Sequence, residues 1–332
     1  MTHSETTSNV MDVSVIVPTY RRTEDLERCL EALKKQTKPA FQVFVIVRDT
    51  DQETWNFLSQ YQSDGLALDV LTIKVTGVIA ALNAGLAAST GDVVTVTDDD
   101  SEAYPDWIEK ISGHFAADPA LGALGGKDRL YENGILQDGE VDVVGKLQWF
   151  GRPIGNHSQG FGQAREVDLL KGVNMSFRKS ALGELRFDER MLGAGAQVHY
   201  EMSFCLALKR AGWKVVYDPA VLVNHFRAER FDEDQRYVFH PVANFNQVYN
   251  ETLVLLDHFS GVQRLVFLLW AIVMGTRAAR GFLQMLRFLP QEGKVSVRYW
   301  LVSMKGRWQA YRFILGPDPA SRALKAKRRV LA

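Results

Sequence analysis

Three consecutive aspartates follow a short apolar segment of the chain. Residues 93–97 read Val-Val-Thr-Val-Thr, which is typical of a strand buried on both faces, and Asp98, Asp99 and Asp100 come directly after it. Because side chains alternate along a strand, we expect Asp98 and Asp100 about 7 Å apart on one side and Asp99 on the other. Such paired carboxylates suit Mg²⁺ or Mn²⁺, which take phosphate oxygens as further ligands. An acidic loop that only caps the next helix is the alternative.

A further carboxylate, Glu201, stands at the start of a helix predicted over residues 200–211. Glu201, Phe204, Cys205 and Leu208 are spaced by three or four residues and therefore share one face of that helix. A carboxylate at the amino-terminal end of an apolar face should point inward, where the helix dipole favours its ionised form. A buried ion pair with an arginine is the structural alternative.

Predicted strands alternate with predicted helices before the aspartates, with strands over residues 13–17, 41–47, 68–75 and 93–97 and helices over 24–35, 54–62 and 79–88. This alternation indicates βαβ units in a mostly parallel sheet flanked by helices, and such sheets bind ligands at the carboxyl ends of their strands. Residues 131–165 show little periodicity, which predicts a disordered segment or a functional loop. Within it, Trp149 and His157 could contact an acceptor or anchor the loop.

Composition indicates a globular protein with an uneven charge. Its 332 residues are 46% hydrophobic and 23% charged, enough for one large α/β domain with an appendage. Residues 259–332 carry fourteen Lys/Arg against two Asp/Glu, whereas residues 1–258 carry 25 basic and 37 acidic residues. We therefore expect a disordered amino terminus over residues 1–12, a catalytic domain over 13–250 and a basic amphipathic helical tail over 251–332.

The basic tail predicts an anionic partner. Residues 262–288 and 295–315 read as two long helices separated by Pro290 and Gly293, and the second has an apolar stripe flanked by cations. Such helices suit the interface of an anionic bilayer, and packing on the catalytic domain or on a second subunit is the alternative. Nucleic acid is not expected, because no base-reading motif accompanies the charge.

Localisation is expected to be cytoplasmic, with peripheral association at the inner face of the cell membrane. The polar amino terminus shows no secretory signal, and the apolar run over residues 265–276 is too short to span a bilayer. Cys29 and Cys205 are expected to be buried thiols of a reducing compartment.

A series of short motifs resembles glycosyltransferase family 2, the inverting nucleotide-sugar enzymes with a GT-A fold. The resemblance covers residues 12–226, and its pieces are residues 13–20, 81–86, 91–92 with the aspartates 98–100, 105–107, 172–178, 210–213 and His225. It implies a GT-A, Rossmann-like α/β fold with the helical tail appended.

The resemblance also implies a nucleotide-sugar site. Pro18, Thr19 and Tyr20 match the loop along the base, and Asp49 or Asp51 would contact the base or ribose, although Arg48 takes the first place of the usual acidic pair. Further residues of the expected site are Asn83, Asp98, Asp99 and Asn174. Asn174 lines the sugar pocket or packs beneath it.

Metal and catalytic roles follow from the same resemblance. Asp98 and Asp100 match the DxD motif that binds the metal, and His225 matches a histidine that in some relatives approaches the metal or the diphosphate. Glu201 matches the catalytic base, with Tyr200 in place of the acidic residue that usually precedes it. For His225, a structural role is the alternative.

The expected function is Mg²⁺- or Mn²⁺-dependent transfer of a sugar, with inversion, from a nucleoside-diphosphate sugar to a hydroxyl of a glycan or lipid-linked glycan. A UDP-sugar is the expected donor. The alternatives are a catalytically inactive sugar-nucleotide-binding or scaffold subunit, and a nucleotidyltransferase, although the latter needs a glycine-rich phosphate loop that residues 18–22 lack.

Overall fold

A computed structural model describes residues 11–231, 234 and 238–315 of the chain. The expected disordered segment 1–12 lies outside the described residues except for its last two, and so does the last part of the basic tail, residues 316–332.

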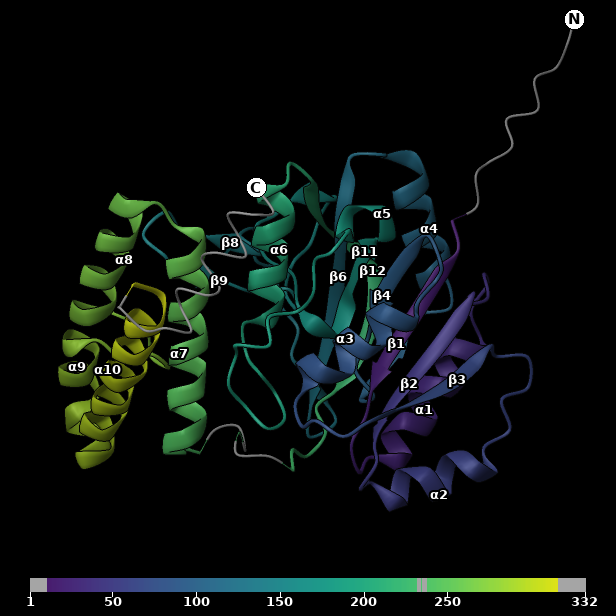
Figure 1. The fold of residues 1–332 in the computed structure, drawn as a ribbon, viewed down its shortest axis with the longest axis horizontal. Coiled ribbons are helices and arrows are strands. Elements are labelled where there is room, and N and C mark those ends of the chain that lie inside the picture. The colour runs from purple at the N-terminus through teal and green to yellow at the C-terminus, as the bar shows by residue number, and fades with distance from the viewer. Residues whose placement is uncertain (1–10, 232–233, 235–237, 316–332) are drawn as a thin grey trace, which may run out of the picture.

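Ten strands of the described chain form one mixed, mostly parallel sheet (Figure 1). Along its main path the order is β10-β12-β6-β11-β4-β1-β2-β3, while β5 pairs with β12 and β7 with β6. The strands are β1 (Val13–Pro18), β2 (Gln42–Arg48), β3 (Leu68–Ile73), β4 (Val93–Val96), β5 (Ser101–Ala103), β6 (Leu121–Glu132), β7 (Ile135–Leu136), β10 (Arg165–Glu166), β11 (Met175–Arg178) and β12 (Lys214–Phe226). Strands β4, β1, β2 and β3 run parallel, and β11 is antiparallel between β4 and β6. The expected α/β class is confirmed.

Helices cover both faces of this sheet. Apolar residues of α1 (Thr23–Lys34) and α4 (Trp107–Ala117) form one core with one face, and those of α3 (Val78–Ala88) and α6 (Tyr200–Arg210) form a second core with the other. Smaller elements are α2 (Gln52–Gln60), the 3₁₀ helix η1 (Gly172–Asn174) and α5 (Lys179–Leu182). Strands β1, β2 and β4 are buried on both faces, as their continuous apolar sequences predict, whereas β3 at the edge of the sheet is partly exposed.

The stretch over residues 131–165 is ordered by short pairings. The end of β6 pairs with β7, and a separate small hairpin joins β8 (Lys146–Leu147) to β9 (Pro153–Ile154). His157 is buried and contacts the carbonyl of Leu169 at 3.0 Å, so it anchors this stretch. The Trp149 side chain is 64% exposed at the tip of the hairpin.

Four helices follow the sheet and stand together at one end of the molecule (Figure 1). They are α7 (Pro241–His258), α8 (Gly261–Val273), α9 (Phe282–Glu292) and α10 (Lys294–Leu315). Helix α7 packs on α6, and apolar residues of α7, α8 and α10 continue the core that lies under α3 and α6. The domain boundary expected at residue 250 therefore falls inside α7.

The first of the two helices predicted for the tail is in fact two. The chain leaves helical geometry between Val273 and Phe282, where Gly275 has φ +65° and the guanidinium of Arg280 is buried against Ser296 and Glu292. Glycine adopts that left-handed conformation without steric cost, so the turn is stable. Pro290 lies inside α9 and does not end this helix, whereas Gly293, with φ +55°, stands between α9 and α10. Among the described residues, no helix combines the length and the hydropathy needed to cross a bilayer.

Candidate active site

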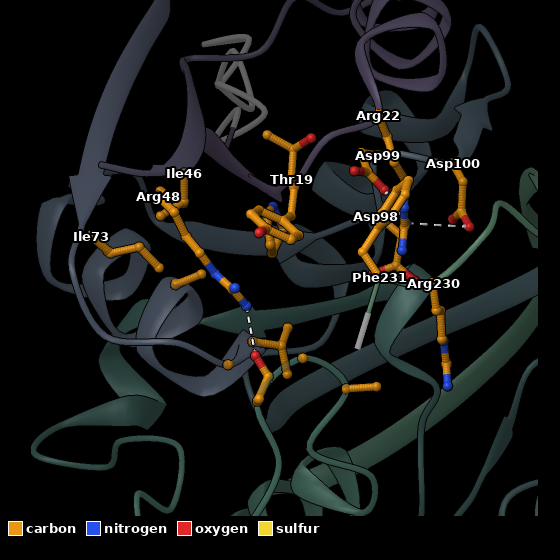
Figure 2. A pocket seen from close by; sticks show the side chains of 18 of the residues that line it. Thr19, Arg22, Ile46, Arg48, Ile73, Asp98, Asp99, Asp100, Arg230 and Phe231 are labelled. Carbon is orange, nitrogen blue, oxygen red and sulfur yellow. Dashed lines mark hydrogen bonds and ion pairs between the residues drawn. The ribbon is translucent and has the colours of Figure 1, made fainter. Parts of the chain in front are cut away.

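A pocket opens at the carboxyl edge of the parallel strands (Figure 2). The chain starts the sheet with β1, adds β2 and β3 on one side, and returns with β4 on the other side of β1. Such a reversal separates the loops that follow β1 and β4, and open α/β sheets bind ligands there. The cavity of about 240 Å³ is lined by Pro18, Thr19, Tyr20, Arg48 and the three aspartates, among others.

The three aspartates lie in a turn that follows β4. Strand β4 ends at Val96, and the turn is closed by the Ser101 N–H, which donates to the carbonyl of Asp98 at 3.2 Å. Oxygens of Asp98 and Asp100 and a nitrogen of His225 all lie within 4.8 Å of one another. The two carboxylates expected on the same side do converge, but a turn brings them together, and they lie closer than strand alternation predicts.

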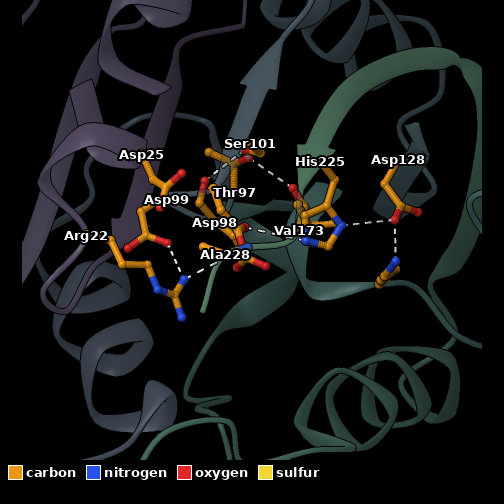
Figure 3. Close-up of polar contacts among 12 residues, drawn as sticks. Arg22, Asp25, Thr97, Asp98, Asp99, Ser101, Asp128, Val173, His225 and Ala228 are labelled. Atoms are coloured by element: carbon orange, nitrogen blue, oxygen red, sulfur yellow. Dashed lines mark hydrogen bonds and ion pairs between the residues drawn. The ribbon is translucent and has the colours of Figure 1, made fainter. Parts of the chain in front are cut away.

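His225 reaches the aspartates through the pairing of β12 with β5, which sets His225 opposite Ser101. Its Nε2 lies 3.4 Å from Oδ1 of Asp100, and its Nδ1 lies 3.3 Å from Oδ2 of Asp128 on β6 (Figure 3). Lys171 also donates to Asp128. Burial alone would raise the pKa of Asp128, but Lys171 and His225 outweigh it and hold that pKa below its usual value.

Asp99 points away from this group toward Arg22. The Arg22 Nη1 donates to Oδ1 of Asp99 at 2.7 Å and lies 3.7 Å from Oδ2 of Asp100. Burial raises the pKa of Asp99 to about 7, although Arg22 opposes the shift. Burial, followed by repulsion from Asp100, likewise raises the pKa of Asp98. Three crowded carboxylates with few cations therefore make this turn a place where additional positive charge stabilises the fold.

The donor set fits a hard divalent cation. Two carboxylates and one imidazole converge without a thiolate, and carboxylate oxygens are the ligands preferred by Mg²⁺ and Mn²⁺. Asp98, Asp100 and His225 would hold the ion.

Glu201 lies in the first turn of α6, next to the lining residue Tyr200, and is not itself among the lining residues of the pocket. Burial, with a further contribution from the charge of Asp98, raises its pKa to about 7, while Lys171 opposes the shift. Its Oε2 is buried without a hydrogen-bond partner, and in the described part of the chain no arginine pairs with it. The carboxyl group is therefore within electrostatic reach of the aspartates, and its pKa suits proton transfer near neutral pH.

Gly172 makes room for the neighbour of Glu201. A Cβ at this position would lie 2.0 Å from the hydroxyl oxygen of Tyr200, so only glycine lets the ring pack here. Tyr200 stands where an acidic residue was expected, and its ring helps to fix the start of α6 beside the pocket.

The residues expected to contact the nucleotide divide into two groups. Pro18, Thr19 and Tyr20 line the pocket, and the guanidinium of Arg48 lies over the Tyr20 ring, 4.1 Å from its centroid. Figure 2 shows Arg48 on the side of the pocket opposite the aspartates. Asp49 is exposed and does not line the pocket.

The second group of expected nucleotide contacts does not line the pocket. It consists of Asp51, Asn83 and Asn174, whose side chains form hydrogen bonds with the backbone nearby. Asp51 caps α2 and accepts from the backbone N–H of Arg21 at 2.8 Å, which fixes the loop after β1. Asn83 bonds both backbone groups of Phe187. The fully buried Asn174 accepts from the indole of Trp107 at 3.0 Å and donates to the carbonyl of Val221 at 3.0 Å.

Several charged residues of the site were not singled out from the sequence. They are Arg22, Asp128, Lys171 and Arg230, of which Arg22 and Arg230 line the pocket. Arg22 directly follows the loop after β1, a position that could have signalled a partner for the aspartates. Asp128 and Lys171 are 43 residues apart and meet only through the pairing of β6 with its neighbours.

Comparison with known proteins gives consistent matches. Residues 14–185 match the family described as glycosyl transferase family 2. The glucosyl-dolichyl phosphate glucuronosyltransferase of Haloferax volcanii is 27% identical over 255 residues, which cover 74% of this chain and 77% of that protein. The amylovoran biosynthesis glycosyltransferase AmsB of Erwinia amylovora is 26% identical over 67% of this chain and 72% of its own length.

Solved structures share the fold. S. aureus TarS 1–349 in complex with UDP-GlcNAc superposes with a TM-score of 0.60 at 17% identity, over 90% of this chain and 81% of that one. GalNAc-T7 with UDP, GalNAc and Mn²⁺ gives a TM-score of 0.62 at 15% identity, over 79% and 50% of the two chains. The sheet is thus that of the GT-A glycosyltransferases, and since the family match covers more than half of the chain, this protein belongs to glycosyl transferase family 2.

Proposed function

We propose that this glycosyltransferase is metal-dependent and inverting, with Asp98, Asp100 and His225 as metal ligands and Glu201 as the catalytic base. The observation that carries the proposal is the convergence of two carboxylates and an imidazole within 4.8 Å at the edge of the sheet, with a third carboxyl group, that of Glu201, near enough for Asp98 to raise its pKa. Mn²⁺ is present in the GalNAc-T7 complex and in that of the mannosyltransferase PcManGT from Pyrobaculum calidifontis, which also share the fold.

Glu201 would accept the proton of the acceptor hydroxyl. As that proton moves to the carboxylate, the acceptor oxygen bonds to the anomeric carbon and the bond from this carbon to the diphosphate oxygen breaks, which inverts the configuration. When bound, a divalent cation neutralises the charge that develops on the leaving diphosphate. Arg22 and Arg230 line the same pocket and add positive charge near that position.

The donor we propose is a UDP-sugar, bound with its base against the Pro18–Thr19–Tyr20 loop and its diphosphate toward the aspartates. The same pocket is lined by the Pro18–Thr19–Tyr20 loop and by Asp98, Asp99 and Asp100, so a base against the loop and a metal-bound diphosphate at the carboxylates would share one cavity. Asp49 and Asp51 as contacts of the base or ribose, and Asn83, Asp99 and Asn174 as parts of the nucleotide-sugar site, stay predictions. The proposed acceptor is a glycan or a lipid-linked glycan. In support, one relative above is named for glucosyl-dolichyl phosphate and the other for amylovoran biosynthesis.

When Mn²⁺ is present, purified protein should hydrolyse at least one nucleotide-sugar or transfer its sugar to an acceptor. A panel of UDP-, GDP- and dTDP-sugars is tested for release of the nucleoside diphosphate, with thermal unfolding recorded in parallel. Because ligand bound only to the native state raises apparent stability by RT ln(1 + [L]/Kd), a binding donor raises the Tm even when no acceptor is present. Binding of several donors with no turnover, even with acceptor glycans added, would favour the alternative of a catalytically inactive sugar-nucleotide-binding subunit.

We also propose that the carboxyl-terminal helices contact an anionic membrane surface. The exposed large apolar side chains of the described chain are concentrated on α8 and α9, among them Val262, Leu265, Leu269, Phe282 and Leu286. Exposed cations lie in the same helices and beside them, namely Arg277, Arg287, Lys294 and Arg298. Apolar side chains next to cations suit the interface of an anionic bilayer, and would hold the enzyme at the inner face of the cell membrane.

The apolar stripe expected on α10 contributes less to this surface than the sequence suggests. The buried face of α10, which packs on α7, carries Ser296, Ser303, Gly306, Arg307, Ala310 and Ile314. Trp308, Tyr311 and Leu315 from the expected stripe are exposed, whereas Val297, Trp300 and Met304 are half-buried. The proposed membrane face is therefore centred on α8 and α9.

The variant Leu265→Glu/Leu269→Glu should bind anionic vesicles on the order of ten- to 100-fold more weakly than the wild type, because burial of a leucine contributes about 1.5–3 kcal/mol at most. Co-sedimentation with phosphatidylglycerol vesicles at low and high salt measures the effect. The control is Val75→Glu, which changes a 67% exposed apolar residue just after β3, outside the carboxyl-terminal helices. Wild-type protein that stays in the supernatant at low salt would contradict the membrane proposal.

A further inference from the structure

Asp128 is a fully buried carboxylate that faces Lys171 and His225 and is not among the lining residues of the pocket. It lies on β6 opposite Val223 of β12, two positions before His225 in the register of the two strands. Side chains two positions apart point to the same face of a sheet, so Asp128 and His225 meet on that face. The Oδ2 of Asp128 accepts from Lys171 and lies 3.3 Å from Nδ1 of His225.

His225 has a different neighbour at each ring nitrogen. Nδ1 faces Asp128, and Nε2 faces the aspartates, 3.4 Å from Oδ1 of Asp100. A neutral imidazole carries one N–H and one lone pair, and only the nitrogen with the lone pair binds a metal. Both neighbours are carboxylates and can only accept. The Nδ1 contact with Asp128 has hydrogen-bond geometry, whereas the Nε2 contact with Asp100 is an ion-pair distance only, so Asp128 favours the proton on Nδ1 and leaves the lone pair of Nε2 directed at Asp98 and Asp100.

We propose that Asp128 is a positioning residue for the metal site, which fixes the tautomer and the ring orientation of His225. This inference rests on the metal-dependent function proposed above. Lys171 supplies the positive charge that keeps Asp128 ionised in a fully buried position, and its side chain is itself only 32% exposed. Histidine ligands commonly depend on such a second carboxylate, and loss of it typically weakens metal binding 10–100-fold.

The variant Asp128→Asn tests the inference, because it preserves the shape of the side chain while replacing one acceptor oxygen by an N–H₂ donor. We expect the dissociation constant for Mn²⁺, measured by electron paramagnetic resonance on the protein alone, to rise 10–100-fold. The matched control is Asp168→Asn, which breaks a comparable Asp–Lys pair with Lys209 that does not touch His225. This control should leave the Mn²⁺ dissociation constant unchanged even if its Tm falls.

A second measurement reads the tautomer directly in the wild type. In protein labelled with ¹⁵N-histidine and free of metal, at a pH where His225 is neutral, the His225 ring should carry its proton on Nδ1. His225→Gln assigns the signal. In Asp128→Asn the signal should shift toward a mixture of tautomers. A proton on Nε2 in the wild type would overturn the inference even if the Asp128 variant did not fold.

The possible outcomes separate this inference from the function on which it rests. Wild-type protein that binds no Mn²⁺ would overturn the metal site and this inference together. If the wild type binds Mn²⁺ and His225→Ala weakens binding, but Asp128→Asn does not, the metal site stands and the role of Asp128 is refuted. A drop in Tm with an unchanged Mn²⁺ dissociation constant would likewise make Asp128 purely structural.

Discussion

Glu201→Gln should lower the rate of sugar transfer by about 10²–10⁴-fold while nucleotide binding stays intact, because general-base assistance contributes that much. Glutamine has nearly the same shape but cannot accept the proton of the acceptor. The fold should tolerate the change, since Glu201 makes no ion pair with an arginine in the described chain and its buried charge is costly. The measurements are turnover of the nucleotide-sugar used by the wild type and the dissociation constant of its nucleoside diphosphate by calorimetry.

The pH profile gives an independent signature of the same group. Because only ionised Glu201 accepts a proton, wild-type activity should rise with pH through the pKa of Glu201, which burial raises to about 7. A bound cation offsets the repulsion from Asp98, so the midpoint in the metal complex should lie at or below that value. The residual activity of Glu201→Gln should not show this rise with pH.

Glu251→Gln is a matched control. Glu251 is a buried glutamate on α7, and burial raises its pKa to about 7 as well, with Arg307 opposing the shift. It belongs to the carboxyl-terminal helices, and unlike Glu201 its pKa receives no contribution from the aspartates of the site. Its replacement should leave turnover unchanged below the Tm. Turnover of Glu201→Gln within a few-fold of the wild type would remove Glu201 from the mechanism.

The sequence predicted the parallel half of the sheet because its signals are local. The β-branched run before Asp98 and the alternation of strands with helices each follow from neighbouring residues. The break between α8 and α9 was harder to predict from the sequence. Residues 274–281 include Gly275 and Gly281, which could have signalled a break, but isolated glycines also occur inside helical patterns, and the flanking apolar and basic residues continue across the segment.

The site was predicted where a residue belongs to a recognisable motif and was missed where it depends on packing. The turn after β4 could be found from three aspartates, although their spacing was derived from a strand that had already ended at Val96. Asp128 could not be found, because its partners are 43 and 97 residues away in sequence. Asn174 matched a family motif, yet its amide is used entirely in holding Trp107, Val221 and Lys127.

Asp98→Asn should abolish the gain in stability and activity on adding Mn²⁺. It should lower the rate of transfer on the order of 10³-fold, about 4 kcal/mol of transition-state stabilisation, because metal ions contribute several kcal/mol of charge stabilisation.

Without metal, the Asp98→Asn variant should be at least as stable as the wild type at pH 8. Burial and the charge of Asp100 raise the pKa of Asp98, so its ionised form destabilises the fold at that pH and an amide removes the repulsion. Thermal unfolding with and without Mn²⁺ measures both effects.

Asp92→Asn provides the control for this prediction. Asp92 stands at the opposite end of β4, where it accepts from the backbone N–H of Asp12 at 3.0 Å, so the change removes the same charge from the same strand away from the pocket. Its Mn²⁺ response and its transfer rate should match those of the wild type. At 100 times the dissociation constant, Mn²⁺ should stabilise the wild type by about 2.7 kcal/mol, and Asp98→Asn should lose that gain. A variant that kept the gain but lost transfer would mean that Asp98 acts on the donor sugar and that the cation is bound without it.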